Sequence, residues 1–220
     1  MCNIAIVNGS PKTRNSVSAM LIGQIEEITK TKATVYQAVK LAEQEDISLT
    51  LSDILNVDIL LFIFPLYIDS LPAPLVKVLG SIEREAAGKD GRLPVVFAVC
   101  SCGFYEAAQT RVALDIIENF AVRAGLKWGY GIGISCGPLV LSQEKNMDKG
   151  RAANVYTALT ALGEAMWGGD VKRGDEAESQ NVFVTPKIPR FFYQLGGDYS
   201  WRKAAKKYNT GKLLKAKPYQ

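Results

Sequence analysis

Three stretches of the sequence, residues 4–7, 57–64 and 95–100, are apolar almost without interruption. Such runs are typical of strands that lie inside a parallel sheet and are covered on both faces. Each run is followed by a segment in which apolar residues recur with helical spacing. These segments are 17–29, 74–87 and 106–124. The alternation of buried strands and amphipathic helices predicts a doubly wound α/β fold with a parallel sheet.

The remaining segments up to about residue 170 continue the alternation. A short edge strand, a short helix, a further buried strand and a last long helix are predicted at 33–38, 49–56, 127–136 and 147–167. The sheet would then have five strands. We expect residues 1–170 to form one α/β domain and residues 171–220 to form a C-terminal extension of different character.

Composition excludes several kinds of chemistry. The chain of 220 residues has no histidine, so catalytic triads, Cys–His dyads and histidine-ligated metal sites are impossible. The four cysteines, Cys2, Cys100, Cys102 and Cys136, form no C-x-x-C pair, which argues against a disulfide framework and fits a reducing cytoplasm. No metal site is expected. The start of the chain does not resemble a signal peptide, and the longest apolar run, 59–66, is too short to cross a bilayer.

The loop between the first strand and the first helix, residues 9–16, is rich in small hydrogen-bonding residues. A strand that ends at a Gly-Ser turn before a helix N-terminus makes an anion site, because backbone N–H groups converge there. Side chains that could donate to a phosphate are Ser10, Lys12, Thr13, Asn15, Ser16 and Ser18. The spacing matches neither a Walker loop nor a dinucleotide fingerprint. The alternative is an ordinary turn in which Ser and Asn cap the helix.

This loop resembles the G-S-P-[RK]-x-x-x-N-[ST] form found in the flavodoxin-like NAD(P)H-dependent FMN reductase and quinone reductase superfamily. Residues 65–75 are similar to the P-x-Y-x-x-x-[LM]-P-[AS]-x-[LM] loop of that family, which wraps the flavin ring. The loop 101–106 matches the family more loosely. The resemblance assigns Ser10, Lys12, Asn15 and Ser16 to the FMN phosphate, Pro65, Leu66, Tyr67 and Ile68 to one side of the ring, and Cys102, Gly103, Phe104 and Tyr105 to the other.

The resemblance implies the flavodoxin strand order 2-1-3-4-5 and an FMN-dependent oxidoreductase. A nicotinamide nucleotide would reduce FMN, and a small acceptor such as a quinone, a free flavin or a nitro compound would take the electrons. No residue is assigned as a catalytic acid or base; Glu106 is expected to cap a helix and Cys102 to be a small buried residue. The alternatives are an FMN-binding electron carrier that docks an acidic partner, and a flavodoxin-like regulatory subunit that has lost FMN.

The extension is basic and aromatic. Residues 187–220 contain nine Lys or Arg and one acid, so their net charge is roughly +8. Such a segment could bind nucleic acid or an anionic surface. Alternatively, its aromatic residues pack on the body or on a second subunit, and this is what we expect. The sequence and the resemblance together predict a homodimer that does not bind nucleic acid.

Overall fold

The structure is a computed structural model that describes residues 2–12, 15–89, 91–167, 181–211, 213 and 216. The chain divides into two compact units, Met1–Pro186 and Lys187–Gln220. The first unit therefore extends further along the chain than the predicted domain 1–170.

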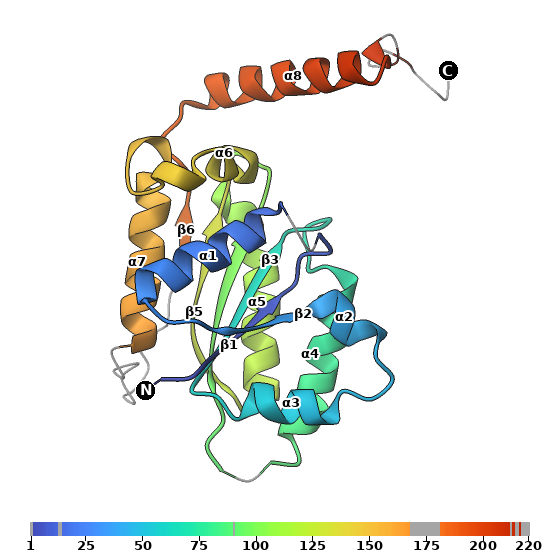
Figure 1. Ribbon diagram of the computed structural model, residues 1–220, viewed down its shortest axis with the longest axis vertical. Helices are drawn as coiled ribbons and strands as arrows, with labels where there is room; N and C mark the ends of the chain where they lie inside the picture. Colours follow the sequence, from blue (N-terminus) through green and yellow to red (C-terminus); the bar gives the residue numbers. More distant parts are fainter. Residues whose placement is uncertain are drawn as a thin grey trace. The chain divides into compact units, whose positions relative to one another are not determined.

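Within the described residues, the first unit contains a six-stranded sheet in the order β2-β1-β3-β4-β5-β6, and every neighbouring pair is parallel (Figure 1). The strands are β1 Ile4–Asn8, β2 Thr34–Gln37, β3 Ile59–Pro65, β4 Val95–Ser101, β5 Lys127–Ile134 and β6 Val182–Val184. The predicted fold class and the order 2-1-3-4-5 are confirmed. The predicted number of five strands misses β6, which is too short to show a period and exists because it pairs with β5.

The helices of this unit differ from the prediction mainly near the carboxyl ends of the strands. They are α1 Val17–Thr29, α2 Ala38–Glu43, α3 Ser48–Leu55, α4 Ala73–Ala86, α5 Arg111–Arg123, α6 Gly137–Ser142 and α7 Ala153–Trp167. The helices α2 and α6 were not predicted. The predicted helix 106–124 begins as a 3-10 turn, Ala107–Thr110, with Glu106 at its N-cap position, and 3-10 turns also precede α7.

The strand predicted over 127–136 ends earlier, at Ile134. Cys136 has a left-handed backbone (φ 54°), which turns the chain directly into α6. Pro138 follows in the first turn of that helix, where a proline is tolerated because its missing N–H has no acceptor there. Pro74 is likewise in the first turn of α4, one position later than predicted.

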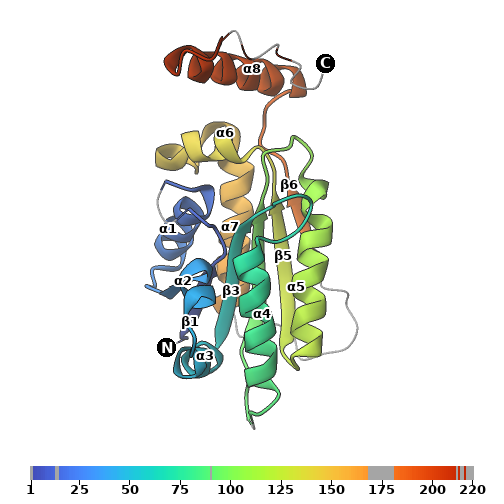
Figure 2. The ribbon, with the colours of Figure 1, turned by 90° about the vertical axis from the view of Figure 1, so that its right-hand side faces the viewer.

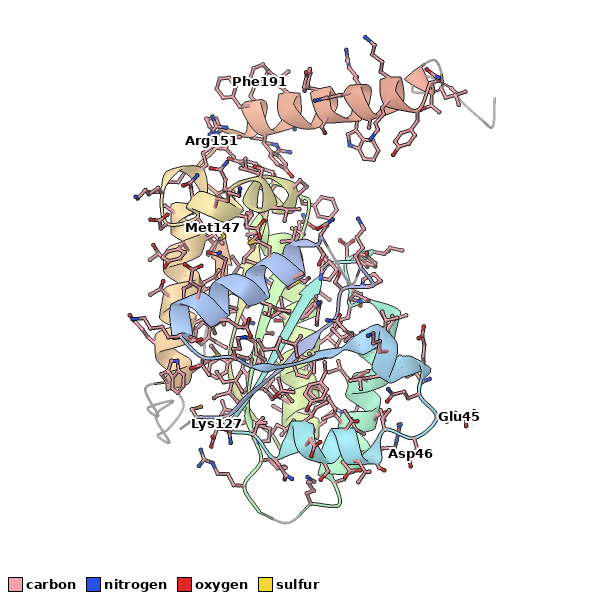
Figure 3. The ribbon with its side chains drawn as sticks, in the orientation of Figure 1. Glu45, Asp46, Lys127, Met147, Arg151 and Phe191 are labelled. Atoms are coloured by element: carbon pink, nitrogen blue, oxygen red, sulfur yellow. The ribbon has the colours of Figure 1, made fainter. Side chains whose placement is uncertain are left out.

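Two helical layers cover the sheet (Figure 2): α1 and α7 lie on one face, and α4 and α5 on the other. Successive strand residues point to opposite layers. Val7 and Phe62 belong to the core under α4 and α5, whereas Ile6 and Leu61 belong to the core under α1 and α7. Met147, in the link between α6 and α7, is buried in this second core (Figure 3).

The second unit contains the helix α8, Arg190–Lys207, which lies within the predicted extension 171–220. Among the described residues, no helix combines the length and the apolar character that a membrane crossing requires.

Candidate functional site

A pocket of about 330 Å³ lies at the carboxyl edge of the sheet, where β1, β3 and β4 end. Its volume is within the usual range for small-molecule sites. Nine of the residues assigned from the sequence line it: Ser10, Lys12, Asn15, Ser16, Pro65, Leu66, Tyr67, Cys102 and Gly103. Three separate loops thus meet at one pocket, at the sheet edge where doubly wound folds bind ligands.

The first loop is held close to the sheet by its own hydrogen bonds. The Gly9 amide donates to the Ile63 carbonyl at 2.9 Å, and the Ser10 amide donates to the Asn8 Oδ1 at 3.0 Å. A Cβ at Gly9 would lie 2.7 Å from the Cβ of Phe64, so this close approach requires glycine. The Lys12 amide then donates to the Ser10 Oγ at 3.2 Å. Thr13 lies outside the described residues.

The loop leads into the N-terminus of α1. Ser16 is the N-cap residue, and its Oγ accepts from the Ala19 amide at 3.1 Å. Ser16 therefore caps the helix, as the alternative interpretation expected, and it also lines the pocket. The Val17 and Ser18 amides have no acceptor within the helix, and the first turn contains no acid. The positive end of the helix dipole therefore faces the pocket without an opposing carboxylate.

Ser18 is the most informative polar residue of the pocket. Its side chain is only 1% exposed, and its Oγ finds no hydrogen-bond partner among the described residues. A buried hydroxyl without a partner costs about 1–3 kcal/mol. A hydrogen-bond acceptor bound at this end of the pocket would remove that cost.

The second loop contains a tight two-residue turn. The Tyr67 amide donates to the Ser70 carbonyl at 2.9 Å, and the Ser70 amide donates back to the Tyr67 carbonyl at 3.0 Å. Between them, Ile68 (φ 48°) and Asp69 (φ 57°) are both left-handed, as in a type I′ turn. A β-branched residue is strained in this conformation. Ile68 is fully exposed and does not line the pocket, whereas Tyr67 lines it and remains 44% exposed.

The third loop follows β4 and continues the pairing with the chain beyond β5. The Cys102 amide donates to the Ile134 carbonyl at 2.8 Å, and the Gly137 amide donates to the Cys102 carbonyl at the same distance. Gly103 lines the pocket, and a Cβ there would meet open space. Phe104 is 53% exposed and Tyr105 is half-buried; neither lines the pocket.

Cys102 lies in the pocket wall but is a poor nucleophile. Burial raises the pKa of its thiol to about 11, and a hydrogen bond to the Phe104 backbone offsets this only in part. The thiol is therefore protonated at neutral pH. This agrees with the expectation that Cys102 is a small buried side chain. Burial also raises the pKa of the neighbouring Cys100 thiol well above its ordinary value.

Six lining residues were not among those assigned from the sequence: Val17, Ser18, Ser101, Gly137, Pro138 and Leu141. Ser18 had been considered as a phosphate donor, but the part supplied by α6 was missed entirely. The signal for α6 was Pro138, since a proline after a strand can mark the first turn of a helix.

Among the residues described as lining the pocket, Lys12 is the only charged one. Most of the polar lining residues come from the first loop and the start of α1, whereas the apolar residues Pro65, Leu66, Pro138 and Leu141 come from other segments. Over the part of the chain that the structure describes, no three Cys, Asp or Glu side chains are placed to bind a metal ion. The pocket suits a ligand with an anionic end and an apolar body.

Comparisons with known proteins agree with this architecture. No protein-family model matches the sequence, and no curated protein does either. An NADH:FMN oxidoreductase solved in its apo form is 13% identical, with a TM-score of 0.56, covering 83% of this chain and 95% of that one. An NADPH-quinone reductase of P. pentosaceus is 17% identical, with a TM-score of 0.54, covering 74% and 98%. The general stress protein 14 of Treponema denticola, solved in complex with FMN, is 14% identical, with a TM-score of 0.54, covering 74% and 99%.

At these identities the likeness concerns the fold. Together with the strand order, it shows that the first unit has the flavodoxin-like fold, as the sequence resemblance implied.

Proposed function

We propose that this chain binds FMN in the pocket at the carboxyl edge of the sheet and is an NAD(P)H-dependent FMN oxidoreductase. The observation that carries the proposal is the pocket itself. One end combines the N-terminus of α1, the Lys12 ammonium and the buried Ser18 hydroxyl, which has no hydrogen-bond partner among the described residues. The rest of its lining is largely apolar. Three structures of the same fold are described by their names as acting on or binding flavin or quinone, which supports the same conclusion.

The phosphate would be held at the α1 end by Ser10, Lys12, Asn15 and Ser16, with Ser18 as a fifth donor. The ring would lie between the second and third loops, against Pro65, Leu66 and Tyr67 on one side and Cys102 and Gly103 on the other. Ile68 and Phe104 adjoin these lining residues and are exposed, and Tyr105 is half-buried beside Phe104. We therefore assign these three residues to the mouth of the pocket.

When bound, FMN supplies the redox chemistry, accepting electrons from a nicotinamide nucleotide and passing them to an acceptor. The contribution of the chain is to bind FMN, to orient it and to exclude water from it. The donors at the α1 end bind and orient the cofactor, and the apolar side chains of Leu66 and Leu141 exclude water. The chain has no histidine, and the Cys102 thiol is protonated, so we assign no proton transfer to a side chain of the pocket.

We further propose a quinone, a free flavin or a nitro compound as the acceptor, and a homodimer as the functional form. The exposed apolar side chains of Tyr67, Ile68 and Phe104 at the mouth support dimerisation, because a second subunit could cover them and complete the acceptor site. Cys2, Cys100, Cys102 and Cys136 are not joined in disulfides, which is consistent with a reducing compartment, and we propose the cytoplasm.

The test is an absorbance spectrum of the purified protein followed by anaerobic titration with NADH and with NADPH. We expect bound flavin that is released as FMN on denaturation, is bleached by one of the two nucleotides, and supports steady-state oxidation when a quinone is added. Release of FAD would contradict the assigned cofactor. Bound FMN without nucleotide oxidation would favour the electron-carrier alternative, and a protein that binds no flavin would favour a regulatory subunit.

A further inference from the structure

One face of α8 carries most of its large apolar and basic side chains. Phe191, Leu195 and Tyr199 follow one another at intervals of four residues, which places them in one row along the helix. Arg202 and Lys206 continue the same row, three and seven residues after Tyr199. The row is thus apolar in the N-terminal half of the helix and basic in the C-terminal half.

The row is exposed along its whole length. The exposed fractions are 64% for Phe191, 49% for Leu195 and 68% for Tyr199, and Arg202 and Lys206 are also exposed. Figure 3 shows the Phe191 ring standing away from the first turn of α8. Two further exposed residues, Phe192 (60% exposed) and Lys203, lie beside the row. They repeat the same division, because Phe192 lies in the apolar N-terminal half of the helix and Lys203 in the basic C-terminal half. An exposed apolar surface of this kind marks an interaction site for a protein or a membrane.

The helix itself also needs a partner. Gly196 and Gly197 lie in its interior, and each lowers helix stability by about 1 kcal/mol relative to alanine. Most helices in proteins are stabilised by packing against another surface more than by helix propensity. We therefore expect α8 to be stabilised by the surface that its exposed row contacts.

We propose that α8 lies on an anionic lipid bilayer, with Phe191, Leu195 and Tyr199 in the headgroup and upper acyl region and Arg202 and Lys206 on lipid phosphates. The segment 187–220 has nine basic residues and one acid, Asp198, which lies beside the row, three residues after Leu195 and four before Arg202. This charge complements a surface of lipid phosphates. Phe, Tyr and Leu beside Lys and Arg are the side chains that favour the interface between membrane and water. The helix would rest on the bilayer and not span it.

Other partners fit the row less well. Single-stranded nucleic acid is bound by aromatic faces interleaved with basic side chains, whereas Leu195 offers no stacking surface and the basic residues are gathered at one end. A second copy of the chain offers less charge complementarity. Since the whole chain has a net charge of +4 and the tail roughly +8, the other 186 residues carry only about −4. The inference uses α8 alone and is independent of the proposed flavin chemistry.

The test measures binding of the full-length protein to vesicles by flotation. The vesicles are pure phosphatidylcholine, or phosphatidylcholine with about one-third phosphatidylglycerol. The probe variant Phe191→Ser/Tyr199→Ser is compared with Tyr193→Ser/Trp201→Ser, which removes two aromatic rings from the opposite side of the helix. The charge variant Arg202→Gln/Lys206→Gln is compared with Arg190→Gln/Lys207→Gln, which makes the same change outside the row. Circular dichroism reports whether each variant is folded.

We expect binding to the anionic vesicles that weakens at high salt, and little binding to the neutral ones. The first aromatic pair should weaken binding at least about tenfold and its control less than about twofold. The charge variant Arg202→Gln/Lys206→Gln should weaken vesicle binding about 30-fold. Its control, Arg190→Gln/Lys207→Gln, should weaken vesicle binding less. The inference is overturned if the protein does not bind anionic vesicles, or if each control weakens binding as much as its probe. It is equally overturned if the probe variants leave vesicle binding intact while dissociating a dimer or abolishing binding to an oligonucleotide.

Discussion

Replacing Ser18 with alanine should have opposite effects on the stability of the apoprotein and on its affinity for FMN. The Ser18 side chain is 1% exposed, and its Oγ lacks a partner among the described residues. Removing an unsatisfied buried hydroxyl recovers part of its desolvation cost of about 1–3 kcal/mol. The free energy of unfolding of the apoprotein should therefore rise by about 1 kcal/mol.

FMN binding should change in the other direction. A hydrogen bond to a charged phosphate contributes about 1.5–3 kcal/mol, so its loss corresponds to an affinity about 10- to 150-fold lower. Riboflavin has the same ring and ribityl chain but no phosphate. Its affinity should change less than about twofold in Ser18→Ala, because the lost contact is to the phosphate alone.

The assays are urea unfolding of the apoprotein and titrations with FMN and riboflavin, followed by flavin fluorescence. Ser81→Ala is a suitable control, because Ser81 is a helical serine on α4 that does not line the pocket and donates to the Lys77 carbonyl. Unchanged FMN affinity in Ser18→Ala would show that the phosphate is bound elsewhere. An equal loss for riboflavin would show that the substitution distorts the pocket.

Further outcomes follow from neighbouring residues. Asn15→Ala/Ser16→Ala should weaken FMN binding and also lower the free energy of unfolding by about 1 kcal/mol, because Ser16 caps α1; an unchanged melting temperature would contradict the capping role. Ile68→Asn should raise the melting temperature, since asparagine tolerates the left-handed φ of 48° and the fully exposed isoleucine side chain has little contact to lose; a lower melting temperature would contradict the type I′ turn. The Cys102 thiol, with a pKa near 11, should react with iodoacetamide about 100-fold more slowly at pH 8 than a free cysteine, as measured by mass spectrometry. Because the folded protein holds this proton more tightly than the unfolded chain, stability should fall as the pH rises from 9 towards 11, and Cys102→Ser should reduce that fall.

Local patterns predicted the parts of this fold that depend on local physics. The helix α1, Val17–Thr29, was predicted with its bounds, because its apolar residues have the helical period and Ser16 is a strong N-cap residue. The central strands were predicted because runs such as Ile59–Phe64 must be covered on both faces. Since parallel strands end at one edge, the three loops that follow them could be expected to meet there, and the pocket lining brings them together.

Other features depend on contacts between distant segments. The strand β6, Val182–Val184, is too short for any period and is defined by its pairing with β5. The helix α6 contributes Gly137, Pro138 and Leu141 to the pocket because the left-handed backbone at Cys136 ends the strand early. The family resemblance also assigned Ile68 to the ring, whereas Ile68 is fully exposed in the turn closed by the Tyr67–Ser70 hydrogen bonds and does not line the pocket.

The sequence alone determined that this chain forms a doubly wound sheet, and it predicts an anion-binding loop after the first strand. Strand and helix periods, the N-cap at Ser16 and the absence of histidine are properties of short segments or of composition, and they do not depend on packing. Only the tertiary structure decided which side chains line the pocket and that the Ser18 hydroxyl is buried with no partner in the part of the chain that the structure describes. Burial and hydrogen bonding of a side chain depend on residues from distant parts of the chain that pack against it, and the spacing of residues along the sequence does not predict these contacts.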